Sequence, residues 1–141
     1  MKLPKRIENS PIVDALIEIR FETNIFKSAV FGLIYQEIMT DYPGQVTQLP
    51  ILQLPEQIRE QDPNLQFKPE YRIENEKFII QIGRDVLCIS SKIPYIGWDA
   101  FSNHAVYIIS KLTNKGSGFL ILINCAYIIL LRKLDSNIGI R

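Results

Sequence analysis

The sequence has few of the residue types that build metal centres and disulfide frameworks. Its 141 residues include two cysteines, Cys88 and Cys125, and one histidine, His104. A metal site needs several converging Cys, His or carboxylate ligands, and a disulfide framework needs several closely spaced cysteines. Both cysteines lie in apolar runs far apart, so we expect buried thiols that behave as small hydrophobic side chains. The sequence therefore predicts no metal site and no cofactor.

Long apolar segments are also scarce. Charges and prolines interrupt the N-terminal residues by Pro11, so no secretory signal is predicted and we expect a cytoplasmic protein. The apolar run at residues 119–131 is shorter than the about 20 residues that a membrane-spanning helix needs. We therefore expect no membrane span.

No excess of one charge marks the chain, which has 16 basic and 15 acidic residues and a net charge of +1. A nucleic-acid-binding protein presents clustered basic residues, so we expect no nucleic-acid partner. The charges are unevenly spread: residues 1–99 hold 11 bases and 14 acids (11 − 14 = −3), and residues 100–141 hold five bases and one acid (5 − 1 = +4). Two interpretations of this asymmetry remain open. It can be a chance distribution with basic residues flanking a strand, or it can mark an acidic domain followed by an atypical tail.

Residues with catalytic potential do not form a recognisable constellation. Asp14, Glu18 and Glu22 lie on one face of a predicted strand, in which four residues span about 13 Å. Paired glycosidase carboxylates stand about 5–9.5 Å apart, which is closer than this strand spacing allows. Arg20 lies between Glu18 and Glu22 on the same face, so we interpret these side chains as a row of alternating charges in solvent. His104 lacks an accompanying nucleophile and orienting group, so we expect a surface or rim histidine. We therefore predict no catalytic residue and a protein that is not an enzyme.

The clearest positive signal is the alternation of apolar and polar residues over residues 12–22. Strand side chains alternate between the two faces of a sheet, so this pattern predicts one buried and one wet face. The predicted buried face consists of Val13, Ala15, Ile17, Ile19 and Phe21. Shorter strands are predicted at residues 45–49, 71–74, 77–83 and 86–91.

Two helices are predicted, at residues 25–41 and 98–112, because their apolar residues recur with helical spacing. The first stripe consists of Phe26, Val30, Leu33, Ile34 and Ile38, and the second of Trp98, Phe101, Ala105, Ile108 and Leu112. These elements predict an α+β domain over residues 1–117, in which a mainly antiparallel sheet of five or six strands has both helices packed on one face. The expected order is β-α-β-β-β-β-α-β. The proline-rich residues 50–70 are predicted to be a surface connector with one helical turn.

Residues 118–141 are predicted to be an apolar, strand-like tail that either completes the sheet or begins a truncated second half. The run at residues 119–131 is apolar on both strand faces, so it needs cover on both sides, as a central strand does. We expect part of it to remain exposed and to favour self-association or docking to a partner. The candidate interface residues in this run are Ile121, Ile123 and Tyr127.

An aromatic corner at Ile93-Pro94-Tyr95-Ile96-Gly97-Trp98 adds two candidate interface residues, Tyr95 and Trp98. Tyrosine and tryptophan are enriched at the hot spots of protein interfaces. Because Trp98 also begins the second helical stripe, core packing is the alternative interpretation.

Several segments of the chain together carry a family resemblance. They are Leu3-Pro4, Pro11-Ile12, Ala15, Glu18-Ile19-Arg20-Phe21, Gln81-Ile82-Gly83 and Pro94-Tyr95-Ile96-Gly97-Trp98. Over residues 3–112 the pattern resembles a sporadically distributed prokaryotic family of uncharacterised proteins. Members of that family look longer and have a second α+β half, which begins with a strand similar to Ile138-Gly139-Ile140-Arg141. The chain therefore looks like the N-terminal half of a truncated or frame-shifted member.

The resemblance implies no catalytic residues, and it implies a binding partner in defence or toxin–antitoxin gene neighbourhoods. We therefore expect a non-enzymatic protein-interaction module whose partner is another protein or a second copy of the chain. Two alternatives remain open at this point. One is a small-ligand-binding domain with its pocket between sheet and helices, and the other is a nonfunctional remnant of a longer protein.

Overall fold

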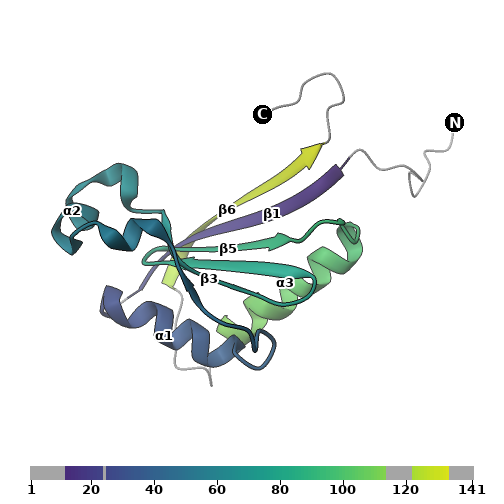
Figure 1. The fold of residues 1–141 in the computed structure, drawn as a ribbon, viewed down its shortest axis with the longest axis horizontal. Helices are drawn as coiled ribbons and strands as arrows, with labels where there is room; N and C mark the ends of the chain where they lie inside the picture. The colour runs from purple at the N-terminus through teal and green to yellow at the C-terminus, as the bar shows by residue number, and fades with distance from the viewer. Residues whose placement is uncertain (1–11, 24, 114–121, 134–141) are drawn as a thin grey trace, which may run out of the picture.

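The computed structural model describes residues 12–23, 25–113 and 122–133, and Figure 1 shows their arrangement. They form one antiparallel sheet of six strands in the order β2-β3-β4-β5-β1-β6. The strands are β1 (Ile12–Glu22), β2 (Thr47–Gln48), β3 (Pro69–Glu74), β4 (Phe78–Gly83), β5 (Val86–Ser91) and β6 (Leu122–Lys133). The long helices are α1 (Lys27–Ile38) and α3 (Trp98–Thr113), and the short helix α2 (Glu56–Gln61) precedes β3.

Helices α1 and α3 lie on the same side of the sheet and share one core with it (Figure 1). α3 contacts β1 and β5, α1 contacts β4, and the two helices contact each other. This arrangement confirms the predicted α+β fold with two helices on one face. The predicted order of strands and long helices is also confirmed, and α2 lies within the predicted connector.

The strand register aligns buried isoleucines in a row beneath the helices. Ile17 of β1 pairs with Ile89 of β5, and Ile89 pairs in turn with Ile80 of β4. Ile80 then pairs with Ile73 of β3, and all of these side chains are buried. Residues directly opposite each other on antiparallel strands share a face, so this row runs across four strands as one continuous part of the core. Burial of each such side chain contributes about 1.5–3 kcal/mol.

Both predicted helical stripes are buried except at their first residues and at Leu33, which is only partly buried against the core. The buried members are Val30, Ile34 and Ile38 on α1 and Phe101, Ala105, Ile108 and Leu112 on α3. Phe26 is exposed because α1 begins one residue later, at Lys27, which leaves Phe26 outside the helix. Trp98 is exposed as the first residue of α3, so its predicted place in the buried stripe is wrong.

Two predicted strands differ from the observed ones. The strand expected at residues 45–49 is reduced to Thr47–Gln48, which pairs with β3 at one edge of the sheet. The tail contributes β6, which pairs with β1 and completes the opposite edge. Residues 118–121 and 134–141 of the predicted tail lie outside the described residues.

Between β2 and β3, residues 49–68 leave the sheet as an excursion that contains α2 and two short 3-10 helices. None of the residues in these three short helices is buried, as expected for a surface connector. The excursion returns tightly against the start of the β4–β5 turn. A Cβ atom on Gly83 would lie 2.6 Å from the carbonyl oxygen of Lys68, so only glycine fits there.

Ile17→Asp is expected to lower the free energy of unfolding by at least about 3 kcal/mol, because it buries an unpaired carboxylate on the helix-covered face. Chemical denaturation measures the difference. Leu16→Asp is the matched control, since Leu16 is the half-buried neighbour on the opposite face and the same change should cost less there. Equal losses in the two variants would contradict the assignment of the faces.

Candidate functional site

The loop between β5 and α3 presents apolar side chains at the surface. Ile93 is 80% exposed, Ile96 is 37% exposed and Trp98 is 42% exposed. We call these three residues the apolar corner. Tyr95 lies between them in the sequence, but it is partly buried and packs against the core. The corner therefore combines one anchoring residue with three exposed apolar residues.

Backbone geometry and ring packing hold the apolar corner in place. Gly97 has φ +101°, a conformation that residues with a Cβ atom rarely adopt, and its carbonyl oxygen accepts a hydrogen bond from the Phe101 amide. The Trp98 ring lies 6.0 Å from the ring of the buried Phe101, measured between centroids. Burial raises the pKa of Tyr95, and its hydroxyl oxygen has no hydrogen-bond partner among the described residues.

The structure divides the predicted interface residues between two ends of the sheet. The Ala15 amide donates to Ser91 Oγ at the end of β5, so the apolar corner lies at the Ala15 end of β1. Ile123 lies near the opposite end, where Leu122 pairs with Glu22, and Tyr127 pairs with Ile19 in the middle. Ile121 lies outside the described residues. Tyr95 and Trp98 therefore do not form one surface with Ile123.

The strand β6 forms an edge of the sheet. It has 12 residues, and those at positions 122–131 carry no charge. Within the described part of the chain it pairs only with β1, which leaves the outer row of its backbone N–H and C=O groups facing away from the sheet. The other edge is β2, which has only two residues.

His104 is partly buried and belongs to an aromatic cluster at the rim of a cleft. Its Nε2 atom lies 2.5 Å from the hydroxyl oxygen of Tyr42, and its ring stacks on Phe78 with centroids 3.9 Å apart. Burial lowers the pKa of His104, and the charge of Asp41 opposes this effect. Burial, together with Asp41, raises the pKa of Tyr42 well above its usual range. We therefore assign a neutral imidazole whose Nε2 accepts a hydrogen bond from the Tyr42 hydroxyl group.

Asp41 joins this cluster to the outer part of α3. Its carboxylate accepts hydrogen bonds from Tyr107 at 3.2 Å and from Lys111 Nζ at 2.7 Å. A cleft of about 380 Å³ lies beside the cluster and is lined in part by Asp41, His104 and Tyr107. Sequence reasoning missed the cluster because Tyr42 and His104 are separated by 62 positions. The contacts fasten the end of α1 to α3, so we interpret the cluster as a latch between the helices.

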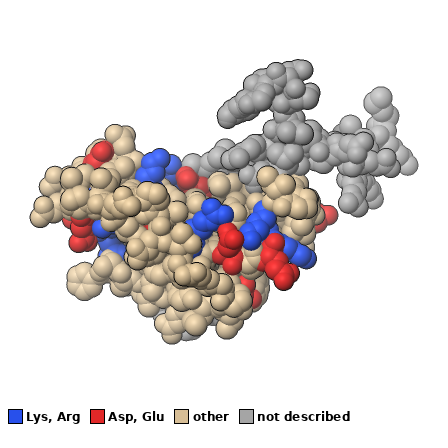
Figure 2. All heavy atoms as spheres, viewed as in Figure 1, with Lys and Arg blue, Asp and Glu red and all other residues tan. Residues whose placement is uncertain are grey.

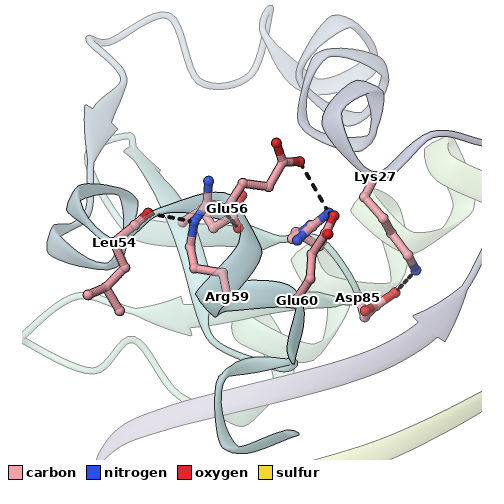
Figure 3. A network of polar contacts seen from close by, with 8 residues as sticks. Lys27, Leu54, Glu56, Arg59, Glu60 and Asp85 are labelled. Carbon is pink, nitrogen blue, oxygen red and sulfur yellow. Dashed lines mark hydrogen bonds and ion pairs between the residues drawn. The ribbon is translucent and has the colours of Figure 1, made fainter. Parts of the chain in front are cut away.

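A second cleft, of about 490 Å³, lies between the excursion and one end of the sheet. Its lining includes Lys27, Arg59, Glu60, Arg84 and Asp85, and we call it the charged cleft. Figure 3 shows Glu56 and Glu60 on α2 and Lys27 beside Asp85. The residues that face this cleft come from α1, the excursion and the β4–β5 turn, and sequence reasoning did not bring them together.

Ion pairs connect the walls of the charged cleft. Lys27 pairs with Asp85, and Arg59 pairs with Glu70 at 2.7 Å. Arg84 pairs with Glu60 at 2.8 Å and with Glu56 at 3.6 Å. On the molecular face in Figure 2, acidic and basic side chains are interspersed, so no extended surface of one sign is visible there.

The thiol of Cys88 is buried, as predicted, and lies on the sheet face opposite the helices. Burial, with the nearby charge of Glu18, raises its pKa to about 12. A thiol with so high a pKa is a poor nucleophile at neutral pH. Cys125 lies in β6, and the structure does not describe its side chain.

Among the described residues, no group of three or more His, Cys, Asp or Glu side chains is placed to hold a metal ion. Within the same residues, no helix has both the length and the apolarity that crossing a membrane requires. Comparisons with protein-family models, curated proteins and solved structures find no match to this chain. The arguments for function therefore rest on the geometry described above.

The lowered pKa of His104 predicts a pH dependence of stability. Between the folded-state pKa and about 6.5, the unfolded chain binds more protons at this residue than the folded chain does. The free energy of unfolding should therefore be highest above about pH 6.5 and should fall as the pH drops below that value.

Denaturation at a series of pH values measures this slope in the wild type and in His104→Gln. The variant should lose the slope above about pH 5.5, where most carboxylates are still ionised. His104 is the only histidine, so no other imidazole contributes in that range. Identical slopes in the two proteins would contradict the assignment of a neutral, buried imidazole.

Proposed function

We propose that this chain is a non-enzymatic protein-interaction module that associates with a second copy of itself through the edge strand β6. The single observation that carries the proposal is the length and composition of this edge. Folded proteins protect sheet edges by keeping them short or by placing charges, prolines or bulges on them. β2 is short, whereas β6 has 12 residues and pairs with β1 in unbroken register from Ala126 to Arg132, with register shifts only toward its two ends. Its charges lie only at Arg132 and Lys133.

Strand addition provides a physical mechanism for the association. An antiparallel pair formed by two copies of one strand is isologous, so each copy supplies the same donors and acceptors. The uncharged stretch at residues 122–131 can pair across a two-fold axis without placing like charges opposite each other. The backbone hydrogen bonds supply affinity, because the outer row of N–H and C=O groups on β6 gains partners from the second copy.

The chemistry of the reactive side chains supports a non-enzymatic role. The His104 ring is engaged by Tyr42 and Phe78, and the Cys88 thiol is protonated at neutral pH. Covalent catalysis requires a nucleophile that an adjacent base or a lowered pKa activates. Among the described residues, neither the His104 ring nor the Cys88 thiol takes part in such a pair. The expected defence or antitoxin association rests on the family resemblance alone and remains part of this proposal.

The two alternative functions have less support. Fully buried side chains, including Ile34, Ile80, Ile89 and Phe101, fill the space between sheet and helices in which a ligand pocket was expected. A nonfunctional remnant would not need to retain the regular rows and stripes of this core. The charged cleft is a different location for a ligand, and it does not depend on β6.

Ile128→Lys is expected to convert a self-associated wild type to monomer. Ile128 pairs with Glu18 in the strand register, so a lysine there gains an opposite charge within its own chain. The lysine also places a charge on the edge strand, which is how folded proteins disfavour pairing at an exposed edge. Sedimentation velocity across a concentration series measures the change.

Val106→Lys is the matched control, because Val106 is exposed on α3 far from the sheet edges and its replacement should leave the oligomeric state unchanged. Circular dichroism and thermal melting check that both variants fold. A wild type that stays monomeric at all concentrations would contradict the proposal. So would dissociation by Trp98→Ser but not by Ile128→Lys, since that result assigns the contact to the apolar corner.

A further inference from the structure

The excursion at residues 49–68 is held against the sheet by polar contacts rather than by the core. Its short helices contribute no buried residue. Arg59 reaches Glu70 on β3, and the guanidinium of Arg20 on β1 lies 4.3 Å from the centre of the Phe67 ring. A segment of this length that adds nothing to the core, yet makes directed contacts, is typical of a cover over a binding cleft.

In the Arg84 ion pairs of the charged cleft, the arginine and its partners differ in how deeply they are buried. The Arg84 side chain is only 13% exposed, but its partners Glu56 and Glu60 are 60% and 52% exposed. A buried guanidinium requires an anionic partner, because removing its charge from water is costly. Carboxylates on an exposed helix can swing into solvent at little cost. Arg84 is therefore fixed in place while its present partners are exchangeable.

The other cations in the cleft are bound differently. Arg59 and Glu70 are both largely buried and are close enough for a direct ion pair, so they form a permanent part of the wall. Lys27 pairs with the buried Asp85 and keeps part of its own side chain exposed at the rim. Among the described residues, the cleft lining and the partners of its arginines hold three basic and four acidic residues, which gives 3 − 4 = −1. Withdrawal of Glu56 and Glu60 into solvent would leave two acidic residues and change this balance to 3 − 2 = +1.

We propose that the charged cleft binds a small molecule bearing a phosphate or carboxylate group, and that Arg84 receives this oxyanion in place of Glu56 and Glu60. The planar guanidinium matches the geometry of either oxyanion through paired hydrogen bonds. The cleft volume of about 490 Å³ lies within the range of small-molecule sites, about 300–1,000 Å³. Lys27 at the rim offers the ligand a second positive contact. When no ligand is bound, Glu56 and Glu60 neutralise the charge of Arg84 in its place.

This binding site goes beyond the proposed self-association and is independent of it. Among the described residues that line the charged cleft, none belongs to β6. Loss of ligand binding would leave the argument for strand pairing unchanged, and a monomeric wild type would leave the argument for the cleft unchanged.

Isothermal titration calorimetry with pyrophosphate and with citrate tests the proposal, at ionic strength held constant with sodium chloride. Pyrophosphate binding without citrate binding would assign the site to phosphates, and the reverse would assign it to carboxylates. Glu56→Gln/Glu60→Gln should bind the preferred probe more tightly, by up to about fivefold, because two competing carboxylates are removed. If the glutamates do not occupy the position of the oxyanion, the double variant should gain no more affinity than the removal of two distant negative charges produces.

Arg84→Gln should lose binding, and Arg72→Gln is its matched control. Arg72 also forms an exposed ion pair, with Glu74, but it does not line the charged cleft. If Arg84→Gln fails to fold, the gain in affinity of the double glutamine variant still tests the proposal. Absence of binding by both the wild type and that variant would overturn it, and so would equal weakening by Arg72→Gln.

Discussion

The insertion of β1 between β5 and β6 is the constraint on which the rest of the structure depends. β1 pairs along both of its sides, and its apolar face lies beneath α3. Both neighbouring strands come later in the chain, so the sheet is complete only after distant segments have met. A slip of one residue in either pairing would turn Ile17 and Ile19 away from the helices. The strict alternation in β1 therefore protects the register of the whole sheet.

The two edges of the sheet have different physical properties because of this arrangement. At one edge, β2 offers too few backbone groups to act as a template for another strand. At the other, β6 offers a long, uncharged template beside the central strand β1. The helices cover a face of the sheet and cannot protect either edge. Strand pairing is thus directed to one side of the molecule, which is why the proposed association involves β6.

Polar chemistry is kept at the two ends of the helix layer, away from the aliphatic core. The latch of Tyr42, His104 and Asp41 lies where α1 ends and meets α3. The charged cleft lies where α1 begins, beside the β4–β5 turn. Buried charges and hydroxyl groups require partners, and the ends of elements are where loops can supply them. The same separation leaves the charged cleft open to solvent and to a ligand.

The sequence by itself determined the elements and their faces, because strand alternation and helical stripes depend on residues at most about four positions apart. The buried face of β1, which includes Ile17, and the stripes ending at Ile38 and Leu112 followed from this short-range pattern. Helix starts were less predictable, because an apolar residue such as Phe26 or Trp98 fits the pattern even where the chain geometry leaves it exposed.

Only the tertiary structure decided which distant residues meet. Tyr42 and His104 are 62 positions apart, and Lys27 and Asp85 are 58 positions apart. Neither pair has a local signal, because each depends on the strand order and on where the helices cross the sheet. The different burial of Arg84 and Glu60 is likewise invisible in the sequence. Exposure is a property of the assembled layers, so the latch and the charged cleft exist only once the sheet, the helices and the excursion have packed together.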